Sequence, residues 1–303
     1  MTVEVREARR DDAEAIAAVA NALTQELYGE ADIDATEVAH WLEMPDLGTF
    51  VATAEGEVVG YADVRDERRR FPIDIRVPPA DQAGSASAAL LDAVEGWARE
   101  RAGPEAVVRS YVSEREENLR AEYEQRGYRL IRHSFLMRVD FEGQPDRPEW
   151  PPEISVRPFE LGRDEERVYE AQQDAFADHW DHQAPPFDEW RRQQIESPHF
   201  DSSLSLVAEE DNEIIGLSLN AWHFSGDPTF GWVGLLGVRR PWRRRGLGSA
   251  LLQESFARFA QRGATRIGLG VDAENTTSAL RLYERAGMRV VRRNDAYERD
   301  IGV

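Results

Sequence analysis

The stretch from residue 235 to residue 249 reads Leu235-Leu-Gly-Val-Arg-Arg-Pro-Trp-Arg-Arg-Arg-Gly-Leu-Gly-Ser249. Its apolar start predicts a buried strand, and the spacing of apolar residues after it predicts a helix over 247–262. Between the two lie five arginines in the seven positions 239–245. Free N–H groups at a helix start bind oxyanions, and glycines let the main chain approach a phosphate closely. The segment therefore indicates a phosphate site, with an ordinary turn beside a solvated basic patch as the alternative.

Around this stretch, strands and helices alternate in a way that indicates an α/β fold with a mixed sheet. A polar turn joins two strands into a hairpin, and a strand-helix-strand crossover follows it. We expect the strands at 154–159, 204–209, 213–222, 230–238, 266–271 and 289–298. We expect the helices at 164–180, 247–262 and 278–286.

A second motif, Val271-Asp-Ala-Glu-Asn-Thr-Thr-Ser-Ala-Leu-Arg-Leu-Tyr-Glu-Arg-Ala-Gly-Met288, follows the basic loop. The two motifs resemble, in order and spacing, the R/Q-x-x-G-x-G/A and N-x-x-A-x-x-L-Y-x-x-x-G-F segments of the Gcn5-related N-acetyltransferases (GNAT). The likeness covers most of residues 154–303. It implies a mostly antiparallel sheet whose central parallel strand pair splays apart, flanked by helices, with acetyl-CoA as cosubstrate.

The resemblance also implies roles for single residues. Backbone groups at 236–238 would bind the pantetheine arm, and amides from 244 to 249 would bind the pyrophosphate. Asn275 would contact the cofactor arm, or else cap the next helix. Tyr283 would donate a hydrogen bond to the leaving thiolate, or else be a core aromatic. The cofactor-binding set is Leu236, Gly237, Val238, Arg243, Arg244, Arg245, Gly246, Leu247, Gly248, Ser249 and Asn275.

The chain repeats itself. Residues 123–132, Tyr-Glu-Gln-Arg-Gly-Tyr-Arg-Leu-Ile-Arg, return 160 positions later as residues 283–292, Tyr-Glu-Arg-Ala-Gly-Met-Arg-Val-Val-Arg. Three further matches keep the same order, so we interpret the chain as two tandem GNAT-like domains. Four prolines between 141 and 153 favour a linker there. The predicted domains are 1–142, a linker at 143–153, and a catalytic domain at 154–303.

The first copy lacks the features of the basic loop. Its counterpart holds no arginine cluster, carries Asp81, and places Pro78 and Pro79 where amides would serve the cofactor. Arg115 stands where Asn275 stands in the second copy. We expect a degenerate domain that packs against the second and shapes the acceptor pocket, which would make the chain a pseudo-dimeric monomer. Whether it binds coenzyme A is left open.

Charge and composition exclude several classes of function. The chain of 303 residues has 57 acidic and 37 basic side chains and a formal charge of −20, which disfavours binding to nucleic acid or anionic membranes and favours a cationic acceptor. It has no cysteine, which excludes thiolate nucleophiles, disulfides and cysteine-ligated zinc. No run of eighteen apolar residues occurs, so we expect a cytoplasmic protein without a membrane span.

Direct attack on a thioester needs a neutral amine, and hence a base. Many tandem relatives carry a glutamate on the strand before the basic loop, whereas Trp232 stands at that position here. Asp272, Glu274 and His223 are candidates, because all three lie at strand ends and the intrinsic pKa of histidine suits the task. A chain of water molecules that ends at backbone carbonyls is the remaining possibility.

The segment Asp178-His-Trp-Asp-His182 has two histidines three residues apart. They could bind a metal if the helix continued through them, but no third ligand has a suitable spacing, so we expect no metal and a cleft-lining segment instead. Within GNAT enzymes this region forms the acceptor side of the cleft. Asp178, Trp180 and Asp181 would therefore recognise an ammonium group.

The sequence thus predicts an acetyl-CoA-dependent N-acetyltransferase that acts on the primary amine of a small molecule by direct attack in a ternary complex. Acetylation of a cysteinyl sugar conjugate, of an antibiotic or of a polyamine fits as well, and so does a non-catalytic acyl-CoA sensor or scaffold. The acceptor, the base and the oligomeric state are not fixed by any residue pattern.

Overall fold

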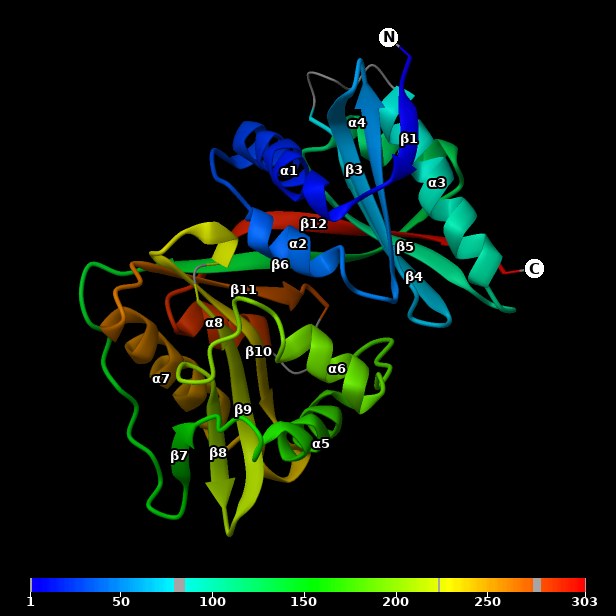
Figure 1. Ribbon diagram of the computed structural model, residues 1–303. Coiled ribbons are helices and arrows are strands. Elements are labelled where there is room, and N and C mark those ends of the chain that lie inside the picture. The colour runs from blue at the N-terminus through cyan, green and yellow to red at the C-terminus, as the bar shows by residue number, and fades with distance from the viewer. Residues whose placement is uncertain (1, 79–84, 223, 275–278, 303) are drawn as a thin grey trace. The chain divides into compact units, whose positions relative to one another are not determined.

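The computed structural model describes residues 2–78, 85–222, 224–274 and 279–302 (Figure 1). The chain forms two compact units. Unit 1 comprises Met1–Ser134 with Arg293–Val303, and unit 2 comprises Phe135–Arg292. Each unit contains a mixed sheet with helices, which confirms the predicted fold class.

Unit 1 is built on five strands that follow each other along the chain, and a sixth strand that comes from the far end of the sequence. The strands pair in the order β1-β2-β3-β4-β5-β12, and among the described pairings of this unit only that of β4 with β5 is parallel. Its elements are β1 (Glu4–Glu7), α1 (Ala13–Tyr28), α2 (Ala35–Trp41), β2 (Leu47–Ala54), β3 (Glu57–Arg65), β4 (Arg70–Arg76), α3 (Ser85–Arg101), β5 (Val107–Ser113), α4 (Glu117–Gln125) and the second part of β12 (Arg289–Asp300).

Unit 2 repeats this plan. Its strands follow the order β7-β8-β9-β10-β11-β6, and β10 and β11 form the parallel pair. Its elements are the second part of β6 (Arg129–Asp140), β7 (Ser155–Pro158), α5 (Glu165–Phe176), α6 (Phe187–Gln194), β8 (Leu206–Glu210), β9 (Glu213–Ala221), β10 (Phe230–Val238), α7 (Leu247–Gln261), β11 (Arg266–Asp272) and α8 (Ala279–Arg285). The last strand of each half therefore completes the unit of the other half.

Two helices cover opposite faces of the unit 2 sheet, and glycines let them approach it. A Cβ at Gly231 would overlap the ring of Phe259 on α7, and one at Gly237 would lie 3.0 Å from the ring of Phe176 on α5. The buried side of α7 includes Leu251, Phe256 and Phe259, as its apolar spacing predicts. The sheet is thus packed tightly on both faces at the point where the site forms.

Several element boundaries differ from the expectation. β10 spans the predicted residues, but α5 ends at Phe176 rather than at Trp180, and α6 was not predicted. No helix in the described part of the chain is long and apolar enough to cross a membrane.

Candidate active site

The parallel strands of unit 2 separate soon after they start. β10 and β11 pair through Phe230 with Arg266, Gly231 with Ile267 and Trp232 with Gly268, and the described pairing stops there. β10 continues to Val238 against β9 on its other side. Beyond Trp232 the main-chain groups of β10 that face β11 are not paired with it in the described ladder, and a space opens between the two strands. This is the splayed arrangement that the sequence predicted.

A β-bulge changes the direction of the side chains along β10. Val233 pairs with Asn220 and Leu235 with Leu219, so Gly234 has no partner residue in β9. An extra residue reverses the alternation of faces. Val233 and Leu236 consequently both pack in the core under α7, while Leu235 packs in the core under α5.

A cavity of about 1150 Å³ opens where β10 runs into α7. Gly246 caps α7 with a φ of +83°, a conformation that favours glycine. The first intrahelical bond is the one that the N–H of Ala250 donates to the carbonyl of Gly246, at 3.1 Å. The N–H groups of residues 247–249 come before that bond, so they have no acceptor within the helix. They lie at the positive end of the helix dipole. The start of α7 thus has N–H groups that can bind an anion.

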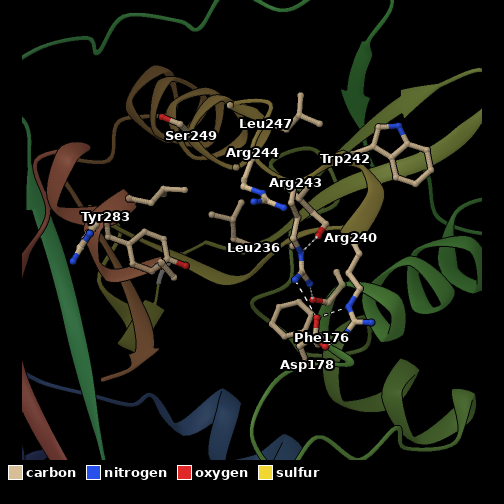
Figure 2. A pocket seen from close by; sticks show the side chains of 18 of the residues that line it. Phe176, Asp178, Leu236, Arg240, Trp242, Arg243, Arg244, Leu247, Ser249 and Tyr283 are labelled. Carbon is tan, nitrogen blue, oxygen red and sulfur yellow. Dashed lines mark hydrogen bonds and ion pairs between the residues drawn. The ribbon is translucent and has the colours of Figure 1, made fainter. Parts of the chain in front are cut away.

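The cavity brings together most of the residues that the sequence placed at a cofactor (Figure 2). Arg245 is not among its lining residues, and Asn275 lies outside the described residues. The predicted residues that line it are Leu236, Gly237, Val238, Arg243, Arg244, Gly246, Leu247, Gly248, Ser249 and Tyr283.

The arginines of the loop carry less free charge than their number indicates. Arg239 is paired with Asp174 and Glu213, Arg240 and Arg243 with Asp178, and Arg245 with Glu210 and Glu153. Among the described residues, Arg244 has no ion-pair partner, and its side chain lines the cavity. We therefore regard Arg244 as the arginine that is free to meet an anion.

Arg243 joins the loop before α7 to α5 and β10 through hydrogen bonds. Its guanidinium donates to the carbonyl of Val238 at 3.2 Å, to the carbonyl of Ala175 at 2.8 Å, and to Asp178 at 3.2 Å (Figure 2). Ala175 lies in the last turn of α5, whose carbonyls have no intrahelical partner. Arg243 thus ties the end of α5 to the end of β10, along one wall of the cavity.

Tyr283 lies on α8, and its hydroxyl is turned toward the interior of the cavity (Figure 2). The side chain is 8% exposed, and this burial raises its pKa to about 12. Tyr283 is therefore a neutral phenol near pH 7 and can donate a hydrogen bond. Gly287, with a φ of +86°, ends the helix, and the N–H of Met288 donates to the carbonyl of Tyr283 at 3.0 Å.

A smaller cavity of about 210 Å³ occupies the space between the separated strands. Its lining includes main chain around the bulge, together with Tyr283, Asp272 and His179. His179 belongs to the segment that the sequence predicted to line a cleft, and it borders this cavity. The sequence did not indicate it as a base, because its place depends on the end of α5 at Phe176 and the turn that follows. Burial, followed by the charges of His182 and Arg243, lowers the pKa of His179.

The other candidate bases are distributed as follows. Asp272 lines the small cavity and accepts a hydrogen bond from the N–H of Glu274 at 2.8 Å, while Glu274 itself is exposed. His223 lies outside the described residues. The indole of Trp232 lies over Gly268, where a Cβ would be 2.8 Å from the ring. In the described ranges, no group of three or more His, Cys, Asp or Glu side chains could hold a metal ion.

Comparisons with known proteins agree with this architecture. The sequence model described as the acetyltransferase (GNAT) family matches residues 13–128 and again residues 165–288. A mycothiol acetyltransferase of Kocuria rhizophila is 30% identical over 259 residues, which cover 79% of this chain and 80% of that protein. One of Actinosynnema mirum is 27% identical over 241 residues, which cover 78% and 79%.

Solved structures give the same result. A GCN5-related N-acetyltransferase from Sphaerobacter thermophilus has a TM-score of 0.81 and 33% identity, with 99% of this chain and 97% of that chain covered. A tandem GNAT protein from the clavulanic acid biosynthesis pathway has a TM-score of 0.79, with coverages of 100% and 99%, but its 16% identity establishes the fold alone. The chain therefore belongs to the GNAT acetyltransferase family and is an N-acetyltransferase.

Proposed function

We propose that the protein transfers an acetyl group from acetyl-CoA to the primary amine of a small molecule by direct attack in a ternary complex, at the site in unit 2. One observation carries this proposal. A helix start with free N–H groups, the splayed ends of β10 and β11, and a buried neutral tyrosine line two cavities of the same unit that share lining residues. The helix start can bind an anion, the splayed strands can hold an extended chain, and the tyrosine can donate a hydrogen bond.

The residues present fit coenzyme A. Its diphosphate needs several N–H donors, and the first turn of α7 offers those of residues 247–249 together with the guanidinium of Arg244. Its pantetheine arm carries amides that pair with an exposed strand edge, and residues 236–238 line the cavity beyond the described pairing of β10 with β11. The proposed contact of Asn275 with that arm rests on the sequence motif. Bound coenzyme A would supply the activated acetyl thioester.

Tyr283 is proposed as the group that assists departure of the sulfur. A thiol is ordinarily a stronger acid, with a pKa of about 8.5, than a phenol whose pKa is about 12. Full proton transfer from the phenol to the thiolate would therefore be uphill. Tyr283 instead lowers the barrier by donating a hydrogen bond that strengthens as negative charge develops on the sulfur.

A narrower candidate is acetylation of a cysteinyl sugar conjugate. It is supported by the names of the relatives, because the Kocuria rhizophila protein is called a mycothiol acetyltransferase and is similar over four fifths of its length. The departure at Trp232 is the reason why we propose the broader acceptor class first. The net charge of −20 is compatible with any cationic amine.

The experiment is an amine panel with a free-thiol readout. Purified protein is incubated with acetyl-CoA and, in turn, a cysteinyl amino sugar, glucosamine, an aminoglycoside and spermidine. We expect thiol release above the amine-free rate with at least one of them, and a product heavier by one acetyl group in mass spectrometry. Binding of acetyl-CoA without amine-dependent release in the whole panel would instead favour a sensor or scaffold.

A further inference from the structure

Acetyl transfer at neutral pH requires a base for the acceptor, because primary alkylamines are mostly protonated there and a protonated amine cannot attack. We propose that His179 is this general base. The inference rests on the proposed function and deepens it, since it names the catalytic group on the acceptor side of the same site.

The position of His179 is fixed by the end of α5. The backbone N–H of His179 donates to the carbonyl of Phe176 at 2.8 Å, and the centroids of the His179 and Phe176 rings lie 4.4 Å apart. Phe176 in turn packs against Gly237 of β10, where a Cβ would lie 3.0 Å from its ring. The imidazole is therefore carried on a tightly packed support rather than on a free loop, as general-base catalysis requires.

His179 lines both cavities of the site. It borders the large cavity where β10 meets α7, and also the small cavity between the separated strands. Four other residues line both cavities: Phe176, Leu236, Ala279 and Tyr283. His179 and Tyr283 thus stand at the junction where an acyl donor held along β10 meets an amine. One can accept a proton while the other donates a hydrogen bond.

The ring nitrogens of His179 are available. Within the described part of the chain, neither makes a hydrogen bond or an ion pair, and the ring is only partly exposed. The nearby carboxylates are engaged differently: Asp178 is paired with Arg240 and Arg243, and Asp272 accepts the N–H of Glu274. An imidazole is also a stronger base than a carboxylate and therefore suits an ammonium group better.

The charges around His179 favour its neutral, proton-accepting form. Burial lowers its pKa most, and His182 on the same segment and Arg243 on the loop before α7 lower it further, while Asp272 at the end of β11 acts in the opposite direction. The remaining charged or titratable side chains that line the two cavities are Asp178, Arg240, Arg244, Arg281, Tyr283 and Arg285. His179 is accordingly deprotonated at pH 7.

The step balances as follows. A ring nitrogen of His179 takes one proton from the acceptor ammonium, and the nitrogen lone pair so released forms the C–N bond to the thioester carbonyl carbon. The C–S bond breaks, and its electron pair leaves with the sulfur, to which Tyr283 donates a hydrogen bond. The nitrogen loses its second proton to the thiolate, which gives the amide and the free thiol. His179 then returns its proton to solvent, so that one proton is released per turnover.

The test compares His179→Gln with His182→Gln, a neighbouring histidine that lines neither cavity. It uses the best acceptor from the amine panel, and kcat/KM is measured from pH 5 to pH 9. For the native protein and His182→Gln, we expect kcat/KM to fall as the pH drops through a value below 6.5, where His179 becomes protonated. In His179→Gln this limb should vanish, and kcat should fall about 100-fold. Its activity should rise only at alkaline pH, as the amine itself loses its proton.

Two further measurements separate chemistry from folding. The Kd of acetyl-CoA, measured by calorimetry, should be unchanged in His179→Gln, and added imidazole should restore part of the activity of His179→Ala. Unchanged kcat and an unchanged pH limb in His179→Gln would overturn the assignment of the base and leave the proposed function standing. Absence of amine-dependent thiol release in the native protein would overturn both.

Discussion

The two units share one strand order but use the end of their parallel strand pair in different ways. Tyr123 on α4 of unit 1 and Tyr283 on α8 of unit 2 occupy equivalent places in the repeat. Tyr123 is fully buried and donates to the hydroxyl of Ser110 at 2.8 Å, whereas Tyr283 lines both cavities of the candidate site. The same residue is thus closed into the core in one unit and open to a ligand in the other.

The surroundings of the strand ends differ in charge as well. In unit 1 the guanidinium of Arg76, at the end of β4, is paired with Asp74 at 2.7 Å and with Asp32 at 3.4 Å. A cavity of about 430 Å³ beside it is lined by Glu116 and Glu122, and no arginine is among its lining residues in the described part of the chain. Acidic side chains without an arginine beside them do not suit a diphosphate, so we propose that unit 1 is a degenerate copy.

The shared strand order and the repeated tyrosine do not by themselves place the tyrosine at a cavity. Unit 2 has, in addition, a cavity that reaches the tyrosine and is lined by the start of α7 and by Arg244. We expect substitutions in the unit 2 site and at matched positions to separate these contributions.

The largest effect is expected from the two tyrosines. Tyr283→Phe should lower kcat about 100-fold with little change in the Kd of acetyl-CoA, because the hydrogen bond to the leaving sulfur is lost. Tyr123→Phe should leave kcat unchanged and lower the free energy of unfolding by about 1 kcal/mol, through loss of the bond to Ser110. Thiol-release kinetics and denaturant unfolding check the pair, and equal kcat values for both variants would refute the distinction.

A smaller effect is expected from two neighbouring arginines. Arg244→Gln should weaken acetyl-CoA binding about 10-fold, because a charge-assisted bond to a phosphate contributes about 1.5–3 kcal/mol and part of it is replaced by water. Arg245→Gln should change the Kd less than threefold, since Arg245 is paired with Glu210 and does not line the cavity. Calorimetric titration of both variants with acetyl-CoA measures the two Kd values. A larger loss of affinity in Arg245→Gln than in Arg244→Gln would place the diphosphate on the other side of the loop.

The smallest effect concerns the pH dependence of unit 1. Burial raises the pKa of Glu116 to about 7. Between about pH 4.5 and pH 7 the folded state therefore keeps a proton that the unfolded chain has lost, so this group makes the protein less stable as the pH rises. Glu116→Gln should remove about 1 kcal/mol of that decline, after allowance for partial exposure.

Urea unfolding at pH 5 and pH 8 measures the change, with the exposed Glu117→Gln as the control. If Glu116→Gln and Glu117→Gln both lose as much stability between pH 5 and pH 8 as the native protein does, Glu116 is not a buried carboxyl beside the unit 1 cavity.

Much of this architecture could be predicted from the sequence, because its signals are local. The apolar run of β10 and the apolar spacing of α7 fixed both elements to within a residue or two. The short helix α6 gave a weak pattern, since Trp190 is its single buried residue. The exchange of last strands could not be predicted, because residues 129–132 and 289–292 have nearly the same local pattern and suit either sheet.

The parts of the site that depend on local backbone conformation could be predicted from the sequence. The parts that depend on contacts between distant residues could not. Gly246 and Gly248 indicated the start of α7. The pairing of Arg245 with Glu210 depends on residues 35 positions apart, which no local pattern reveals. The place of His179 depends on the contact between Phe176 and Gly237.

The proposed function requires that one acyl donor binds per chain, at the start of α7. Calorimetric titration of acetyl-CoA into the native protein, Gly246→Asp and Gly246→Asn tests it most directly. Both substitutions put side chains of the same shape at a φ of +83°, which Asp and Asn tolerate comparatively well, so that they differ in charge alone. We predict one site per chain in the native protein, measurable binding in Gly246→Asn and none in Gly246→Asp. Two sites per chain, or native-like binding in Gly246→Asp, would contradict the account.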